Sequence, residues 1–169
     1  MKKAILVALI IIGAVAFLSF GTSRVIKDIR FKIDCTQHLK RAADANTIEI
    51  AEKELKIVLD YLEERELTSG IVSIFLKQPK NDIGFWYGNI KASYEELLTV
   101  NPDATQLEKS NVLMKLRETL VDDGEEMTVT HPNGISVYPN NVLYFWWGLI
   151  SFFFTLILSI VVGWIWWDL

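Results

Sequence analysis

Two long stretches without a charged side chain, one near each end, constrain this sequence more than any other feature. They cover residues 4–20 and 142–167. A helix rises about 1.5 Å per residue and a bilayer core is about 30 Å thick, so roughly 20 apolar residues can cross it. We therefore expect transmembrane helices in residues 1–23 and 142–169 that flank a soluble domain in residues 24–141.

The N-terminal stretch also has features of a cleaved signal peptide, since Lys2 and Lys3 precede the apolar run. However, the run is longer than a usual signal-peptide core, and no Ala-x-Ala site follows it. We therefore expect the stretch to be retained as a signal anchor.

Tryptophans stand at both ends of the C-terminal stretch. Indole rings prefer the headgroup level of a bilayer. From Trp147 to Trp164 a helix covers roughly 26 Å, which matches the hydrocarbon core. The predicted membrane-interface anchors are Trp146, Trp147, Trp164, Trp166 and Trp167.

The same stretch carries small residues at helical spacing, a pattern that lets another helix approach closely. Hydroxyl groups on such a face can also bond across the contact. The predicted helix-packing interface is Gly148, Ser151, Thr155, Ser159 and Gly163. Its partner can be the first helix, through Ala4, Ala8 and Ala16, another copy of the chain, or another membrane protein.

The distribution of basic residues favours one orientation. Lys2 and Lys3 favour a cytoplasmic N-terminus, whereas Arg24 and Lys27 pull the other way. Two spans place both termini on one side. We expect an integral protein of a bacterial inner membrane, with both termini cytoplasmic and the soluble domain periplasmic.

The middle region is mildly acidic, since 15 basic and 20 acidic residues give it a formal charge of about −5. This balance argues against nucleic-acid binding, which needs a basic patch. Residues 25–67 read as helical, with a break at 44–47 where Asn46 and Glu49 fit a capping pattern. The predicted packing stripes are Ile26, Ile29 and Ile33 before the break, and Ile48, Ala51, Leu55, Val58 and Leu62 after it.

Later segments predict two more helices and a hairpin. The apolar run in residues 71–76 predicts a strand or a buried extended segment. Asp82 can cap one helix, and Asp103 with Gln106 can open the next as a capping box. Its expected stripe is Leu107, Leu113, Leu116 and Leu120, with Gly124 closing the helix.

Residues 127–138 show alternating β-branched residues around a Pro-Asn-Gly turn, which predicts a small β-hairpin just before the second span. The expected fold is therefore mainly α: two transmembrane helices flank a helical bundle that carries this hairpin.

Few residues suggest chemistry. Cys35 and His38 are one helical turn apart, but two ligands do not make a zinc site. Residues 122–126 are acidic and lack the ligand spacing of a calcium loop. We therefore expect no catalytic, metal or cofactor site. An aromatic cluster is the possible partner or ligand surface: Phe85, Trp86, Tyr87 and Tyr94.

These features favour a non-enzymatic accessory or scaffold subunit that binds partner proteins through its second span and its helical domain. Only two residues follow the second span, so we expect any signal to pass sideways to a partner. One alternative is a ligand-binding sensor subunit whose pocket is lined by Trp86, Tyr87 and Tyr94. The other is a membrane-bound enzyme, which would need converging Asp, Glu or His residues in a deep cavity.

Overall fold

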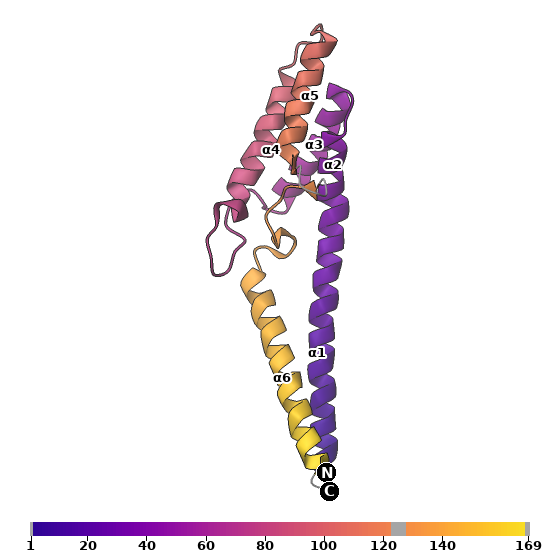
Figure 1. The fold of residues 1–169 in the computed structure, drawn as a ribbon, viewed down its shortest axis with the longest axis vertical. Helices are drawn as coiled ribbons and strands as arrows, with labels where there is room; N and C mark the ends of the chain where they lie inside the picture. The colour runs from indigo at the N-terminus through magenta and orange to yellow at the C-terminus, as the bar shows by residue number, and fades with distance from the viewer. Residues whose placement is uncertain (1, 123–127, 168–169) are drawn as a thin grey trace.

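A mainly helical chain with a small two-stranded antiparallel sheet emerges from the computed structural model, which describes residues 2–122 and 128–167. The helical domain lies at one end of an elongated molecule, and two long helices run from it toward the two termini (Figure 1). The α-helices are α1 Lys2–Phe31, α2 Gln37–Ala43, α3 Ile48–Glu64, α4 Ile83–Leu98, α5 Gln106–Leu120 and α6 Asn141–Trp167. The shorter elements are η1 Lys32–Thr36, η2 Pro79–Asn81, β1 Val121–Asp122, β2 Thr128–Val129 and η3 Ile135–Val137.

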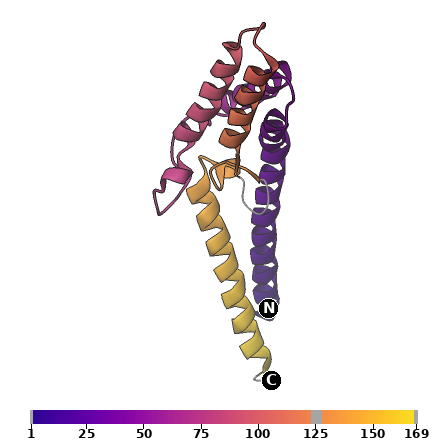
Figure 2. The ribbon, with the colours of Figure 1, turned by 45° about the horizontal axis from the view of Figure 1, so that its top comes forward.

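Two helices are long and apolar enough to cross a membrane, within residues Ala4–Ala43 and Asn141–Ile165. In each helix only 6% of the most apolar window is buried, so neither is the covered core helix of the domain. The helices α1 and α6 pack against each other, and both point their free ends away from the domain. The two helices run in opposite chain directions, and their ends, which overlap in Figure 1, separate in Figure 2.

The first helix continues from the apolar stretch into the domain, as the sequence predicts, because no glycine or proline interrupts residues 22–43. The five residues of η1 form a π-helical turn inside it. From the last residue of α1 onward, the buried face of this helical run is Phe31, Cys35, Leu39 and Ala42.

The predicted stripe at Ile26, Ile29 and Ile33 is wrong as a packing face, because these side chains are 45–50% exposed. The apolar spacing was real, but the rest of the domain covers the face that contains Phe31 and Cys35 instead.

The break after α2 and the stripe of α3 are confirmed. Residues Ile48, Ala51, Leu55, Val58 and Leu62 are all buried. The cap, however, is Thr47 rather than Asn46. Thr47 has extended backbone angles, and its hydroxyl accepts a hydrogen bond from the Ile50 amide.

Caps also define α4 and α5. The Asp82 carboxylate accepts from the Phe85 amide, as expected. The capping box of α5 is formed by Thr105 and Glu108, so the prediction for Asp103 and Gln106 is wrong by two residues.

The expected stripe of α5 is correct only in its second half. Leu116 and Leu120 are buried and Leu113 is half-buried, whereas Leu107 is exposed because the first turn of α5 extends beyond its neighbours. The predicted stop at Gly124 lies outside the described residues.

The predicted hairpin at 127–138 is wrong. The sheet pairs β1 with β2, so that Val121 faces Val129 and Asp122 faces Thr128. The predicted second strand is the short helix η3 instead. Gly134 does adopt a positive φ of 85°, but the turn leads Ile135 and Val137 into buried positions rather than back along β2. Met127 and most of the acidic run in 122–126 lie outside the described residues.

The prediction that residues 71–76 form a strand or a buried extended segment is also wrong. Ile71 makes an isolated bridge to Asp82, and only Val72 is buried. Ile74, Phe75 and Leu76 are exposed in the loop between α3 and α4, which lies on the side of the domain from which α6 extends (Figure 1).

The core lies where α2, α3, α4 and α5 meet, and η1 contributes to it. Cys35, Leu39, Ala51, Leu55, Val58 and Leu62 have no exposed side-chain surface. This continuous apolar core holds the domain on the extension of α1.

Candidate functional site

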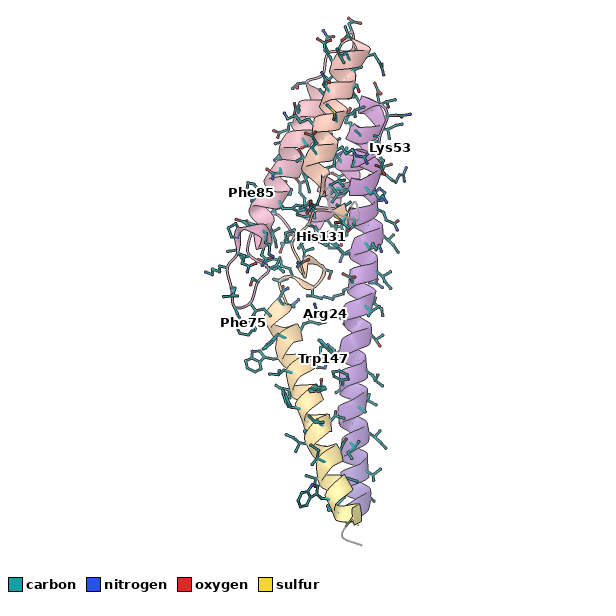
Figure 3. All side chains as sticks on the ribbon, in the orientation of Figure 1. Arg24, Lys53, Phe75, Phe85, His131 and Trp147 are labelled. Carbon is teal, nitrogen blue, oxygen red and sulfur yellow. The ribbon has the colours of Figure 1, made fainter. Side chains whose placement is uncertain are left out.

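The N-terminal half of α4 carries the aromatic cluster, and helical geometry divides it into two groups. Ile83, Trp86 and Ile90 face the core, since residues three and four apart share one face of a helix. Phe85 therefore projects to one side of this face, and Tyr87 projects to the other. Phe85 is 67% exposed, and Figure 3 shows it pointing away from the domain.

A groove of about 450 Å³ lies beside Phe85, between α4, η2, the end of α5 and the segment after β2. Most of its surface is apolar. We call it the Phe85 groove. Its lining residues are Pro79, Lys80, Asp82, Phe85, Trp86, Asn89, Ile90, Thr119, Leu120, Thr130, His131 and Pro132.

Trp86 connects this groove to the core. Its side chain is 8% exposed, and its indole Nε1 donates a hydrogen bond of 2.7 Å to the Thr130 carbonyl oxygen. His131 packs edge-on against the ring of Phe31, with 5.4 Å between the ring centroids. The inner wall of the groove therefore packs against the core, whereas the Phe85 side chain is exposed at the rim.

Tyr87 and Tyr94 lie on the opposite side of α4, so the structure does not bring Trp86, Tyr87 and Tyr94 into one cavity. The Tyr87 hydroxyl donates a 2.6 Å hydrogen bond to Glu63 Oε1. This bond stabilises the neutral phenol and raises the pKa of Tyr87 to about 12. Tyr94 is half-buried against the core. Tyr87 therefore joins α4 to α3, and neither tyrosine lines the Phe85 groove.

The small-residue face of α6 is divided between a covered part and an open part. A Cβ added at Gly148 would lie 2.7 Å from the Phe20 ring, and one added at Gly13 would lie 2.6 Å from Thr155 Oγ1. Ser151 is buried in the same contact. Thus α1 covers Gly148, Ser151 and Thr155.

The open part is the end of α6 away from the domain. Ser159 is exposed, and nothing lies within 4 Å of a Cβ built at Gly163. On α1 the contact is made by Gly13, Phe17 and Phe20. Ala4 and Ala8, which the sequence suggested as the matching face, are exposed.

The hydroxyls of this face bond along their own helix. Ser151 donates to the Trp147 carbonyl, Thr155 to that of Ser151, and Ser159 to that of Thr155. The hydrogen bond across the helix pair is instead the 2.7 Å contact between Ser23 Oγ and the Tyr144 hydroxyl. The Nζ of Lys27 lies 5.2 Å from the centroid of the same Tyr144 ring.

The predicted interface anchors of α6 differ in exposure, where their side chains are described. Trp164 is 73% and Trp146 is 50% exposed, whereas Trp147 packs against Phe20 at 6.0 Å between centroids. The side chains of Trp166 and Trp167 lie outside the described set.

A buried ion cluster was missed by the sequence reasoning. The Glu54 side chain is 3% exposed, shares a 2.6 Å hydrogen bond with His38 Nδ1 and forms an ion pair with Arg41 Nη2 at 2.6 Å. A signal for it existed, because Glu54 is three residues after Ala51 and four before Val58, on the buried stripe of α3.

This cluster also separates the two residues that suggested a metal site. His38 turns its Nδ1 to Glu54, and Cys35 is fully buried in the core. Among the residues that the structure describes, no three His, Cys, Asp or Glu side chains gather closely enough to hold a metal ion.

Comparisons with protein-family models, with curated proteins and with solved structures find no match to this chain. The helix pair, the Phe85 groove and the surfaces around them are therefore the features that indicate a function.

Proposed function

We propose that this chain is a non-enzymatic accessory or scaffold protein, anchored in a membrane by α1 and α6, that binds a partner protein at the Phe85 groove. The observation that carries the proposal is the exposed ring of Phe85 above a groove whose wall is the core residue Trp86. Aromatic side chains next to well-packed pockets are frequent hot spots of protein interfaces.

The helix pair supports the anchoring. Both apolar helices leave their outer faces uncovered, and the exposed side chains on them are overwhelmingly apolar. A soluble protein rarely exposes so large an apolar surface. Because both helices point away from the domain, both termini belong on one side of the membrane. With Lys2 and Lys3 at the start of the chain, we place the termini in the cytoplasm of a bacterium and the helical bundle in the periplasm.

The open part of α6 supports a lateral contact as well. Ser159 and Gly163 are small and uncovered, so a helix of another membrane protein, or of a second copy, can approach closely there. In this proposal α1 packs on the covered part of the α6 face, and the partner helix packs on the open part.

A ligand-binding sensor is the second candidate, and the size of the groove is the observation that favours it. A volume of about 450 Å³ lies within the usual range of small-molecule sites. Of the predicted lining of Trp86, Tyr87 and Tyr94, only Trp86 lines this groove. Phe85 and Asn89 take the place of the two tyrosines.

Photo-crosslinking in intact cells tests the proposal. A benzophenone amino acid at position 85 should form an adduct of one defined protein mass, and the same group at exposed Lys91 on α4 should not. If the chain is a small-molecule sensor instead, the group at position 85 should form no protein adduct, because a small ligand occupies the Phe85 groove.

A matched pair of variants makes the test quantitative. Phe85→Asp should weaken binding of the crosslinked partner by about 30-fold or more, as expected for a hot spot of at least 2 kcal/mol. Lys91→Asp should leave it unchanged. If Phe85→Asp retains the partner at wild-type affinity in a folded chain, the groove is not the binding site.

A further inference from the structure

The loop between α3 and α4 exposes consecutive apolar side chains at its tip. Phe75 is 70%, Leu76 is 68% and Ile74 is 37% exposed, although the domain has a core that could have buried them. An exposed run of this kind is uncommon on a soluble surface and marks a contact with another apolar phase.

The loop is not a loose segment, because hydrogen bonds hold its base. The Ile83 amide donates to the Gly70 carbonyl at 2.9 Å, and the Val72 amide donates to the Asn81 carbonyl at 3.0 Å. Val72 is buried and anchors the first part of the loop in the core. The tip is therefore presented in a fixed direction.

That direction is toward the membrane end of the molecule. The ring of Phe75 packs edge-on against Phe145 in the second turn of α6, with 5.0 Å between centroids. Phe145 in turn packs against Trp146 at 5.3 Å. Figure 3 shows Phe75 beside the first turns of α6, at the level where the two long helices leave the domain.

The charges around the tip indicate where the headgroups lie. Arg24 is the first charged residue that follows the apolar stretch of α1, and it lines the same hollow as Phe75 and Phe145. Lys77 and Lys80 follow the apolar tip directly and are exposed. Basic side chains at this level can reach lipid phosphates while the apolar tip lies deeper.

We propose that Ile74, Phe75 and Leu76 form a third membrane contact, inserted into the boundary between headgroups and acyl chains of the leaflet that α1 and α6 enter. The occupant is phospholipid, because the tip is continuous with the aromatic belt of α6 and no further partner is needed at that depth. This inference rests on the proposed anchoring of α1 and α6 in a membrane.

Fluorescence of the full-length chain in phosphatidylcholine–phosphatidylglycerol vesicles tests it. In a Cys35→Ala background, single cysteines replace Phe75, Leu76, Lys53 or Ile157 and carry an environment-sensitive NBD dye. Lys53 lies in the part of the domain farther from α6, and Ile157 lies in the middle of α6. Two loop positions are used because the Phe75 substitution also removes the contact with Phe145.

The labels at 75 and 76 should show blue-shifted emission, loss of quenching by aqueous iodide, and stronger quenching by lipids brominated near the headgroup than by lipids brominated near the chain end. The label at 53 should behave as in water, and the label at 157 should be quenched most by deeply brominated lipid.

Other outcomes overturn the inference in distinguishable ways. Water-like labels at 75 and 76, with the label at 157 in lipid, refute the loop contact and leave the anchoring intact. Labels at 75 and 76 shielded from both iodide and brominated lipid mean that protein covers the tip, which also refutes it. A label at 157 that brominated lipid does not quench refutes the anchoring itself.

Discussion

Glu54 is a carboxylate in the core of the helical domain, and its two partners are unequally exposed. The side chain of Glu54 is 3% exposed, whereas those of His38 and Arg41 are 24% and 66% exposed. Removing the partners and removing the carboxylate should therefore have very different effects on the free energy of unfolding.

Removing the partners leaves a buried charge without compensation. For the double variant His38→Ala with Arg41→Ala we expect a loss of about 3–5 kcal/mol, the usual cost of breaking a buried ion pair from one side. Much of a domain stability of about 5–15 kcal/mol would disappear. Replacing Glu54 by Met, which has a similar volume, leaves two groups that water can reach. We expect this variant to lose less than about 2 kcal/mol, mainly from lost hydrogen bonds.

The single cysteine of the chain provides the assay. Cys35 is fully buried beside this cluster, so a thiol reagent reaches it only when the domain opens. A loss of 3–5 kcal/mol corresponds to labelling that is roughly 10²–10⁴-fold faster. Near-ultraviolet circular dichroism of the same variants in detergent gives a readout that does not depend on Cys35.

An exposed pair on the same helix is the control. Lys56 and Asp60 form a surface ion pair at 3.2 Å, and Lys56→Ala should leave Cys35 labelling unchanged. The reasoning is refuted if Glu54→Met opens the domain as much as the double variant does.

Two further predictions concern the helix pair and alkaline pH. In a Cys35→Ala chain, cysteines that replace Gly13 and Thr155 should oxidise readily to a disulfide. Adding Gly148→Leu should slow this oxidation, because the new side chain meets the Phe20 ring. Adding Gly163→Leu should leave the rate of oxidation unchanged. Equal rates would contradict the packing. Because the pKa of Tyr87 is raised to about 12, its bond to Glu63 stabilises the fold below pH 10 and is lost as the pH rises toward 12. Tyr87→Phe should abolish that contribution, and unfolding titrations at several pH values check it.

Local signals in the sequence succeeded where one short segment decides the outcome. The Asp82 cap depends on a side chain and an amide three residues later, and the stripe of α3 depends on spacing alone. Capping was off by one residue at Thr47 and by two at Thr105, because several Asn, Asp and Thr residues compete there and only the backbone angles select one.

Exposure was the least predictable property. The stripe of Ile26, Ile29 and Ile33 and the run Ile74–Leu76 look like core segments by composition, yet these side chains are exposed. Glu54 looks like a surface residue and is buried. Whether a face is covered depends on segments far away in the chain. The periodicity of one segment carries no information about those other segments.

The Phe85 groove illustrates the same limit. The sequence identified Phe85 and Trp86, but the opposite wall comes from Thr119, Leu120 and the segment that follows β2. Only the packing of α4 against α5 brings these residues together, so the grouping with Tyr87 and Tyr94 did not form a pocket.

By itself the sequence determined the two long apolar helices, the break after residue 43 and the helical character of the domain, since each follows from the composition of a continuous segment. The tertiary structure decided which part of the α6 face contacts α1, that Glu54 is buried, and that the loop before α4 brings its apolar tip against the first turns of α6. These depend on contacts between distant residues, because the free energy of burial belongs to the surface that two segments share and not to either segment alone.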